Sequence, residues 1–399
     1  MTLAFLIYSY FPYGGQQRDF MRLVREGLRR GHHITVYTMK WQGERPEGVS
    51  IVIVPVKAWT RHGLYRRFTA AVNTLLQRQT PDGVIGFIKM PGLDVYHAAD
   101  PCFAERALHQ RAFYYRFTPR YRHFRDYEEA VFGPGSQTQV LLLSPLQRSQ
   151  FARHYPGCEP RLHDLPPGIE RDRQAPANAA QIRAQFRHEF GLGEKDHAVL
   201  QIGSGFVVKG VDRSLRAIAA LPPEVRQRVR YFIVGQDKPS HFQRLAERLG
   251  ISTLCTFLGG RDDVPRFLQG SDLLLHPAYS ESAGYVLLEA TIAGLPVLTT
   301  ATCGYAFHIT RAGSGEVCES PFQQEELNAR LLHMLTTPER DSWRRNGIEY
   351  GHSANLYSMA ETALDLIESS LHPRLSKKVN VNLSPNKSTT AAATTGRAS

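Results

Sequence analysis

The chain has 399 residues, of which 42% are hydrophobic and 21% charged, a composition typical of a soluble globular protein with room for two domains. No apolar run is long enough to span a membrane, and residues 1–8 predict a first strand rather than a signal peptide. The formal net charge is +11. Residues 106–125 and 373–399 hold this whole excess and contain no acid, so the sequence predicts two local basic segments and not a basic surface throughout. The five scattered cysteines lack metal-ligand spacing and indicate structural thiols in a reducing cytoplasm.

Apolar, β-branched runs alternate with helical patterns through most of the chain. Strands are predicted over residues 3–9, 33–38, 49–56, 83–88 and 139–144, and then over 198–203, 230–235, 272–276, 296–300 and 315–318. Helices are predicted over residues 17–30, 66–79, 145–154, 211–220, 240–249, 285–293, 324–335 and 355–371. The alternation predicts an α/β protein with parallel, doubly wound sheets, and the two series predict two Rossmann-like domains.

The boundary between the two series is predicted at Pro166-Pro167-Gly168, which follows a strand end and forms a plausible hinge. The predicted domains are residues 1–168 and 169–354, and residues 375–399, rich in Ser, Thr, Asn and Ala, are expected to be a disordered tail. Such sheets bind ligands beyond the carboxyl ends of their strands, so we expect the substrates in the cleft between the domains.

The first predicted strand and helix are joined by a turn that contains Gly14 and Gly15. Two glycines let the backbone approach a bulky anion, and the start of the helix directs its N–H groups at it, although a turn without function is an equally good explanation. Arg18 and Asp19 are predicted to project near this turn. Asp100, at the end of a strand-like segment, could hold a ligand hydroxyl, accept its proton, or cap a helix.

Residues 106–125 interleave six arginines with six aromatic residues. This pattern suits an anionic membrane surface, where the aromatic rings lie at headgroup depth and the arginines contact phosphates. It also suits single-stranded nucleic acid, or a merely solvated basic helix. Because no other segment resembles a nucleic-acid module, the membrane is preferred. The residues assigned to it are Arg106, Arg111, Tyr114, Tyr115, Arg116, Arg120, Arg122 and Arg125.

Two segments of the second predicted domain indicate an anionic ligand. Lys209 follows a glycine-rich turn that is neither a P-loop nor a good dinucleotide motif, so it is predicted to neutralise a diphosphate unless it is a plain surface lysine. Glu281 and Glu289 flank Gly284, where a helix is predicted to begin with free N–H groups. A phosphate seat between two acids suits a sugar joined to a diphosphate, although two solvated glutamates on an ordinary helix are the alternative.

No metal site is expected, because the sequence has neither an Asp-x-Asp pair nor a His/Cys cluster with ligand spacing. The positive charge that a leaving diphosphate needs must then come from side chains and from a helix N-terminus. The candidates are Lys209, Arg173 and the helix after Gly284.

These motifs together resemble the retaining family 4 glycosyltransferases of GT-B fold, and more closely the lipopolysaccharide core glucosyltransferases. The resemblance runs from residue 1 to about residue 370. The segments that carry it are Phe11-Pro-Tyr-Gly-Gly, Gln17-Arg-Asp-Phe, Lys89-Met-Pro-Gly-Leu-Asp-Val-Tyr, Arg120-Tyr-Arg-His, Lys209-Gly-Val-Asp-Arg-Ser, Val234-Gly-Gln-Asp-Lys-Pro, Leu274-Leu-His-Pro-Ala-Tyr and Gly294-Leu-Pro-Val-Leu-Thr-Thr.

The resemblance implies UDP-glucose as co-substrate, no further cofactor, and the inner-core heptose of a heptosylated lipid A-core as acceptor. It implies an α-1,3 link with retained configuration, made at the cytoplasmic face of the inner membrane, and a last helix that crosses back to the first domain. Glu281 would hold hexose hydroxyls, Glu289 the ribose and Lys209 the diphosphate. The remaining donor contacts implied are Gly14, Gly15, Arg173, Ala283, Gly284, Tyr285 and Val286, and Asp19 and Asp100 complete the catalytic set.

One departure from the family pattern concerns the diphosphate. Ser204 stands where these enzymes usually carry an arginine, so the second positive charge is assigned to Arg173. Retention without an obvious nucleophile suggests a front-face reaction, in which an oxygen of the leaving diphosphate assists deprotonation of the acceptor hydroxyl. Two alternatives stay open: a family 4 transferase with another nucleotide-sugar donor or glycolipid acceptor, and a nucleic-acid-binding protein built on residues 106–125.

Overall fold

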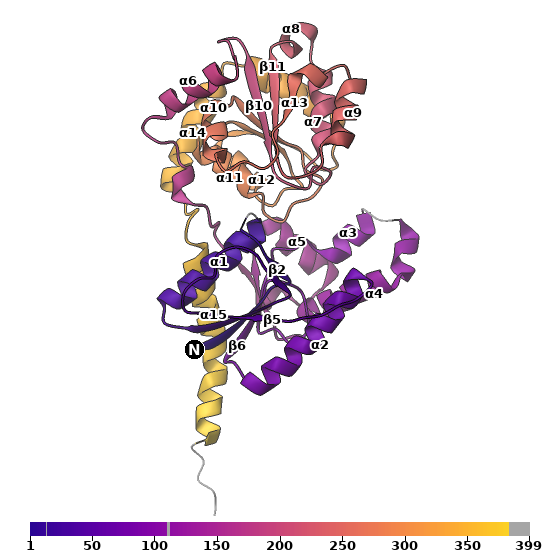
Figure 1. Cartoon of the computed structure of the whole chain (residues 1–399), viewed down its shortest axis with the longest axis vertical. Coiled ribbons are helices and arrows are strands. Elements are labelled where there is room, and N and C mark those ends of the chain that lie inside the picture. The colour runs from indigo at the N-terminus through magenta and orange to yellow at the C-terminus, as the bar shows by residue number, and fades with distance from the viewer. Residues whose placement is uncertain (13, 110–111, 383–399) are drawn as a thin grey trace, which may run out of the picture.

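The structure, a computed structural model, describes residues 1–12, 14–109 and 112–382. Two sheets, each parallel throughout, lie one above the other along the long axis of the molecule (Figure 1). The α/β prediction with parallel, doubly wound sheets is confirmed. Because parallel strands are covered by helices on both faces, their sequences are nearly continuous apolar runs, and this is why most of them could be recognised.

The first sheet lies between residues 2 and 164. Its strands, in spatial order, are β5 (Val49–Ile53), β3 (His33–Thr38), β1 (Thr2–Leu6), β6 (Gly83–Gly86), β7 (Val95–His97), β8 (Gln139–Leu142) and β9 (Leu162–Asp164). Its helices are α1 (Gly15–Arg29), α2 (Arg61–Gln79), α3 (Phe103–His109), α4 (Pro119–Phe132) and α5 (Pro145–His154). A separate pair joins β2 (Ser9–Tyr10) to β4 (Lys40–Trp41) beside the end of β1.

The second sheet lies between residues 197 and 318. Its strands, in spatial order, are β12 (Cys255–Phe257), β11 (Val229–Val234), β10 (His197–Ile202), β13 (Leu273–His276), β14 (Val297–Thr300) and β15 (Gly315–Cys318). Its helices are α6 (Ala179–Glu189), α7 (Val211–Ala219), α8 (Pro223–Arg226), α9 (Ser240–Arg248), α10 (Val264–Gly270), α11 (Tyr285–Ile292), α12 (Ala306–Ala312), α13 (Gln324–Thr336) and α14 (Arg340–Ser353).

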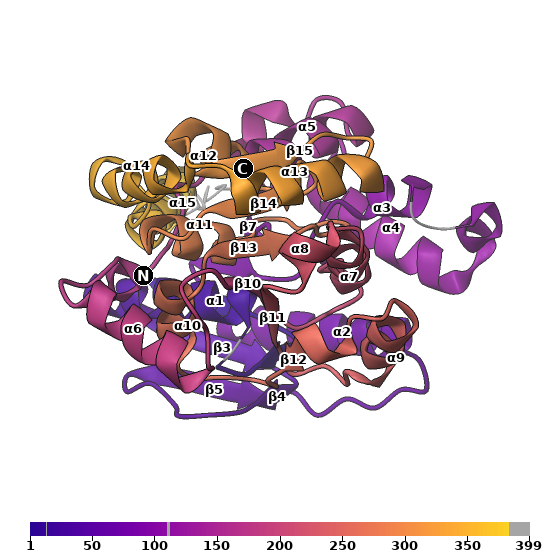
Figure 2. The same ribbon diagram turned by 90° about the horizontal axis from the view of Figure 1, so that it is seen from above.

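Alternation along each strand divides the core around the second sheet into two layers, one on each face of the sheet. Figure 2 shows the ribbon from above. Leu200 of β10 faces the layer that contains Phe186 of α6, while its neighbour Val199 faces the layer that contains Leu215 of α7. Successive side chains of a strand point to opposite faces, so each strand holds helices on both sides of the sheet.

The chain passes between the two sheets twice, and the two passages touch. The Ile169 N–H donates to the Leu356 carbonyl at 2.9 Å. Gly168 lies so close to Met359 that a Cβ at position 168 would approach the Met359 Cε atom to 2.9 Å, which explains a glycine at the end of the Pro-Pro-Gly segment. The boundary predicted at residue 168 therefore falls where both passages are held together.

The last helix, α15 (Met359–Asn382), descends beside the first sheet and packs against α1 (Figure 1). It passes through Pro373 and continues to Asn382, so the described helix extends into the segment that was expected to be a disordered tail. The predicted helix ended at residue 371, two residues before this proline. An interior proline removes one backbone hydrogen bond, but here the helix continues past it. The rest of the predicted tail, residues 383–399, lies outside the described residues.

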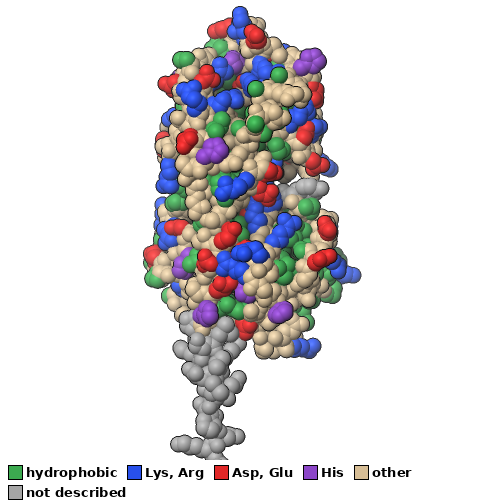
Figure 3. Space-filling view, turned by 90° about the vertical axis from the view of Figure 1, so that its left-hand side faces the viewer, with side chains coloured by type: hydrophobic (Ala, Val, Ile, Leu, Met, Phe, Trp, Pro, Cys, Tyr) green, Lys and Arg blue, Asp and Glu red, His purple; other side chains and the backbone are tan. Residues whose placement is uncertain are grey.

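Charge is unevenly placed on the molecule. Figure 3 shows the side opposite α3 and α4, where acidic and basic side chains are interspersed. This agrees with a basic excess that is local rather than general. Among the described helices, none combines the length and the apolar character that a membrane crossing requires.

Candidate active site

Lys209 and Glu281 meet at the carboxyl edge of the second sheet. Lys209 lies in the loop that follows β10, and Glu281 lies in the loop that follows β13, the strand paired with β10. The Lys209 ammonium donates to Glu281 Oε1, and His276 Nε2 lies 2.7 Å from Glu281 Oε2. Two segments 72 residues apart in sequence thus place one cation and one carboxylate where open α/β sheets bind their ligands.

The Glu281 carboxylate is ionised in this setting. Burial opposes its charge, but the Lys209 ammonium and His276 outweigh burial and lower the pKa of Glu281 to about 2. Its backbone is fixed as well, since its N–H donates to Thr302 and its carbonyl accepts from Gly304. The carboxylate is therefore held in position before any ligand arrives.

Glycines shape the turn that presents Lys209. Gly210, with φ of +70°, begins α7, and a Cβ there would lie 2.1 Å from the Pro277 carbonyl oxygen at the end of β13. This close approach brings the two loops together. Ser204, the departure from the family pattern, accepts a hydrogen bond from the Gln236 N–H at 3.1 Å and so serves the loop structure instead of supplying charge.

The start of α11 is free of any side-chain cap, as the sequence predicts. Gly284 precedes the helix with φ of +103°, a conformation that favours glycine, and none of its neighbours caps the first turn. Ala283, Tyr285 and Val286 are buried around it. The Leu287 N–H donates to the Gly284 carbonyl at 2.9 Å, whereas no hydrogen bond to another described residue is made by the N–H groups of Gly284, Tyr285 and Val286, so these three offer an anion seat beside Lys209 and Glu281.

The glycine turn before α1 meets α11 across the junction of the two sheets. A Cβ on Gly15 would lie 3.7 Å from the Tyr285 ring. The Tyr285 hydroxyl donates to Asp19 Oδ2 at 2.6 Å, and Arg18 donates to Glu289 Oε1 at 2.9 Å. Gly14 is the residue before α1, where a Cβ would collide with the Gln17 side chain. The two predicted anion turns therefore face each other.

Asp19 is fully buried at this junction and also accepts from Arg22 at 3.0 Å. Burial raises its pKa to about 6 in spite of Arg22 and Tyr285. His97 Nε2 lies 3.9 Å from Asp19 Oδ2, and neither ring nitrogen has a hydrogen-bond partner among the described residues. Burial lowers the pKa of His97 to about 4. Sequence reasoning missed His97, although it lies at the end of β7, three residues before the predicted Asp100.

Arg173 does not join this cluster. It lies in a short 3-10 helix (Arg171–Arg173), where its Nε is 3.6 Å from Asp172, and within the described chain no hydrogen bond or ion pair connects it to Lys209 or Glu281. Two residues later, the Ala175 N–H donates to the Ile292 carbonyl, at the far end of α11 from Gly284. Arg18, whose guanidinium lies 5.7 Å from the Tyr285 ring centre, is closer to the start of α11.

Folding brings together a cluster of potential metal-ligand side chains that the spacing of residues in the sequence does not reveal. Potential ligand atoms of His276, Glu281 and Cys303 lie within 4.8 Å of one another. Both Glu281 oxygens already have partners, Lys209 and His276, so a cation there would have to displace the lysine. The arrangement is that of a half-buried ion pair.

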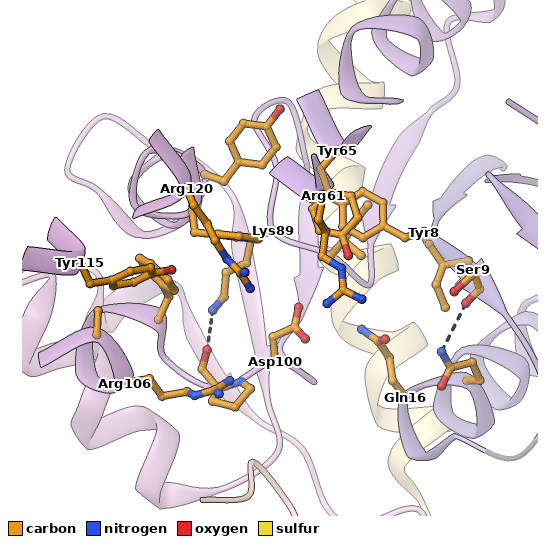
Figure 4. Close-up of a pocket in the computed structure, with 18 residues that line it drawn as sticks. Tyr8, Ser9, Gln16, Arg61, Tyr65, Lys89, Asp100, Arg106, Tyr115 and Arg120 are labelled. Carbon is orange, nitrogen blue, oxygen red and sulfur yellow. Dashed lines mark hydrogen bonds between the residues drawn. The ribbon is translucent and has the colours of Figure 1, made fainter. Parts of the chain in front are cut away.

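Asp100 lies at a cavity of about 370 Å³ on the first-sheet side (Figure 4). It is open to the cavity, and the desolvation that the surrounding protein imposes raises its pKa despite Lys89 and Arg106. Ser9, Gln16 and Gln17 also line the cavity, so it borders the first turn of α1. Asp100 and Asp19 are therefore on the same side of the junction but in different surroundings.

The basic aromatic segment is divided by the structure. Arg106 of α3, Tyr115 of a 3-10 helix (Phe113–Phe117) and Arg120 of α4 line the cavity. The remaining described members, Tyr114, Arg116, Arg122 and Arg125, are exposed, and Arg111 lies outside the described residues. Phe113 and Phe117, which were not singled out from the sequence, are 77% and 78% exposed. The segment thus has a cavity side and an outer side.

Comparisons with known proteins agree with this geometry. Residues 182–350 match the family described as Glycosyl transferases group 1. The chain is 46% identical, over 93% of its length and 100% of the relative, to the lipopolysaccharide glucosyltransferase WaaG of Escherichia coli strain K12. A crystal structure of WaaG, described as a glycosyltransferase involved in lipopolysaccharide biosynthesis, superposes with a TM-score of 0.86 over 92% of this chain and 99% of that one.

A more distant structure bears on the fold alone. The Anabaena protein HepE, solved with UDP-glucose, is 17% identical and superposes with a TM-score of 0.71 over 92% of this chain and all of that one. The predicted GT-B fold, two facing Rossmann-like domains, is supported by these neighbours, and the resemblance drawn from the motifs is confirmed. By its identity and coverage, the chain belongs to the WaaG family of glycosyltransferases.

Proposed function

We propose that the protein transfers glucose from UDP-glucose to the inner-core heptose of lipopolysaccharide, with retained configuration and an α-1,3 link. The observation that carries the proposal is the Lys209–Glu281 pair beside the open start of α11, in a chain 46% identical to a lipopolysaccharide glucosyltransferase. Donor, linkage and stereochemistry follow from the family resemblance, and the site is chemically suited to them.

Donor binding requires an exchange of partners. Lys209 would turn from Glu281 to the diphosphate, which also receives the N–H groups of Gly284, Tyr285 and Val286. Glu281, still fixed by His276, would then accept hexose hydroxyls, and Glu289 would accept the ribose as Arg18 releases it. Each carboxylate keeps a hydrogen-bonding role in both states, so little reorganisation is needed.

The reaction would then proceed at the junction of the sheets. As the glycosidic bond breaks, charge builds on the diphosphate, and Lys209 stabilises it more in the transition state than in the ground state. Arg18 is our preferred source of the second charge because it already lies at the start of α11, whereas Arg173 would have to reach along the helix. Asp19 and Asp100 would orient the acceptor hydroxyl. No metal or further cofactor is part of this proposal.

The enzyme is proposed to act at the cytoplasmic face of the inner membrane as a peripheral protein. Phe113, Tyr114 and Phe117 are all exposed in one short 3-10 helix, and α4, which follows it directly in the chain, carries exposed arginines. Aromatic rings at headgroup depth and arginines on phosphates would hold the first-sheet side on an anionic surface. An acceptor anchored in that membrane would then be within reach.

A transfer assay tests the proposed function. Purified protein is incubated with a heptosylated lipid A-core acceptor and with radiolabelled UDP-glucose, UDP-galactose or UDP-N-acetylglucosamine in turn. We expect label in the glycolipid from UDP-glucose alone, with an α-1,3-linked hexose on heptose. Transfer from a different donor instead would show that the protein is a family 4 transferase that uses another nucleotide sugar. Retention on oligonucleotides but not on anionic liposomes at physiological salt would favour the nucleic-acid alternative.

A further inference from the structure

The cavity beside Asp100 has a lining that the reaction with the donor does not use. Its volume of about 370 Å³ falls in the range of small-ligand sites, roughly 300–1,000 Å³. Among the described residues, five charged side chains line it: Arg61 from the start of α2, Lys89 from the loop after β6, Asp100 from the loop after β7, Arg106 from α3 and Arg120 from α4. Four of the five are cations, so the cavity suits an anion.

Two of these cations are not neutralised by the protein. Lys89 is committed, since its ammonium lies 2.6 Å from the fully buried Glu128 and also donates to the Pro101 carbonyl. By contrast, Arg61 and Arg120 form no ion pair within the described part of the chain. Figure 4 places their guanidinium groups, on helices far apart in sequence, toward the same space as Asp100. Both side chains are exposed, so water that now screens their positive charge can be replaced by an anionic group of a ligand.

The rest of the lining suits a saccharide. Tyr8 and Tyr65 stack on each other with ring centres 3.7 Å apart, and both belong to the wall, with Tyr115 facing the same cavity. Aromatic faces accommodate the C–H faces of sugar rings, while Asp100, Gln16 and the tyrosine hydroxyls can bond hydroxyl groups. The cavity therefore combines anion recognition with hydroxyl recognition.

The cavity also lies next to the donor site. Gln16 and Gln17 line it, and the residues on either side of them, Gly15 and Arg18, contact Tyr285 and Glu289 of α11. One turn of α1 thus touches the cavity and the donor site at once. A saccharide seated in the cavity can present a hydroxyl to the junction without leaving it.

We propose that this cavity is an acidic-saccharide subsite, in which Arg61 and Arg120 bind a phosphate or carboxylate group of the acceptor glycan. The inference rests on the proposed function, because it takes the acceptor to be a charged core glycolipid. Arg120, which was assigned to membrane binding from the sequence, binds the glycan in this proposal. The exposed aromatic residues of the same segment face the membrane.

Equilibrium binding of the deacylated acceptor glycan tests the subsite without membrane and without turnover. Arg61→Gln and Arg120→Gln are compared with Arg66→Gln, an exposed arginine of α2 that does not line the cavity. We expect each cavity variant to weaken glycan binding by about tenfold or more and the control to bind like the wild type, with UDP binding equal in all four proteins. Circular dichroism checks that the variants fold.

Modified glycans identify the anion. Binding of a phosphate-free glycan and of a carboxyl-reduced glycan is measured with the wild type and Arg120→Gln. The penalty of the substitution should disappear with whichever glycan lacks the recognised group. If it persists on a glycan that lacks both groups, or if the cavity variants bind like Arg66→Gln, the subsite assignment is wrong. If the wild type binds the glycan but transfers no glucose to the native acceptor, the proposed function fails and the subsite stands.

Discussion

The two sides of the junction handle charge in opposite ways. On the second-sheet side every charged donor-site group has a protein partner: Lys209 has Glu281, and Glu289 has Arg18. On the first-sheet side, Arg61 and Arg120 face an open cavity without a carboxylate partner in the described chain. On the donor side, ion pairs within the protein hold the charged side chains in position and exchange partners when the donor binds. On the acceptor side, Arg61 and Arg120 gain an anionic partner only when the ligand binds.

The largest effect is expected on the donor side. Lys209→Ala, or Glu281→Ala, should lower kcat by about 100-fold or more, because a preorganised electrostatic contact to the leaving diphosphate or to the hexose is lost. Steady-state transfer of glucose from UDP-glucose measures it. The exposed Lys195→Ala in the same domain is the control. Wild-type turnover in either variant would remove the pair from the site.

On the first-sheet side, the double variant Phe113→Ser, Phe117→Ser should weaken binding to anionic liposomes by about tenfold or more. Each exposed ring contributes apolar area that the headgroup region can bury. Co-sedimentation measures the bound fraction, and Ile53→Ser, which removes an exposed apolar residue of β5, serves as control. Unchanged liposome binding would leave these rings without a membrane role, while binding of the deacylated glycan should not change in any case.

The hydrogen bond between Tyr285 and Asp19, which joins the two sides, can be removed by deleting one oxygen atom. Tyr285→Phe removes the 2.6 Å hydrogen bond to Asp19 and should lower kcat by roughly fivefold, the scale of about 1 kcal/mol for one hydrogen bond. Tyr305→Phe is the matched control, because it also removes one buried hydroxyl and its ring packs on Tyr285, but within the described residues that hydroxyl makes no hydrogen bond to Asp19. Equal kinetics for the two variants would show that the Asp19 contact does not matter.

The smallest effect concerns stability. Burial raises the pKa of Asp19 to about 6 from its ordinary value of 3.8, so between these values the folded protein binds a proton that the unfolded chain does not. Folding therefore loses stability as pH rises from about 4 to 6. The Tm advantage of Asp19→Asn over the wild type should grow across this window by a few degrees and then stay constant. Asp126→Asn, an exposed carboxylate, controls for loss of charge. A Tm difference independent of pH would contradict the buried titration.

The core strands were predictable because burial on both faces leaves a recognisable apolar run, as in β10, β11 and β13. The short edge strands β9 and β12, with three residues each, give too little pattern. The helix α4 was not predicted, because its first residues belong to the basic aromatic segment 106–125, which was interpreted as a surface patch. Its Pro119 follows Thr118, whose side chain caps the helix by accepting from the Tyr121 N–H at 3.1 Å, and this was the signal available.

The site was predictable in part. Glu281, Gly284 and Lys209 could be assigned because each follows a recognisable strand, and ligands gather at that edge. The pairing of Arg18 with Glu289 could not, since the two residues are 271 positions apart and depend on how the two sheets face each other. For the same reason, the sequence did not predict that Arg120 lines the cavity with Arg61, because the two residues lie on different helices.

A calorimetric titration with UDP tests the division between the two sides most directly. The wild type, Lys209→Ala and Arg120→Gln are titrated under identical conditions. We expect Lys209→Ala to weaken UDP binding by about tenfold or more, because the diphosphate loses its cation and meets an unpaired Glu281, and Arg120→Gln to bind UDP like the wild type. Loss of UDP affinity in Arg120→Gln with none in Lys209→Ala would place the donor in the cavity and contradict the account.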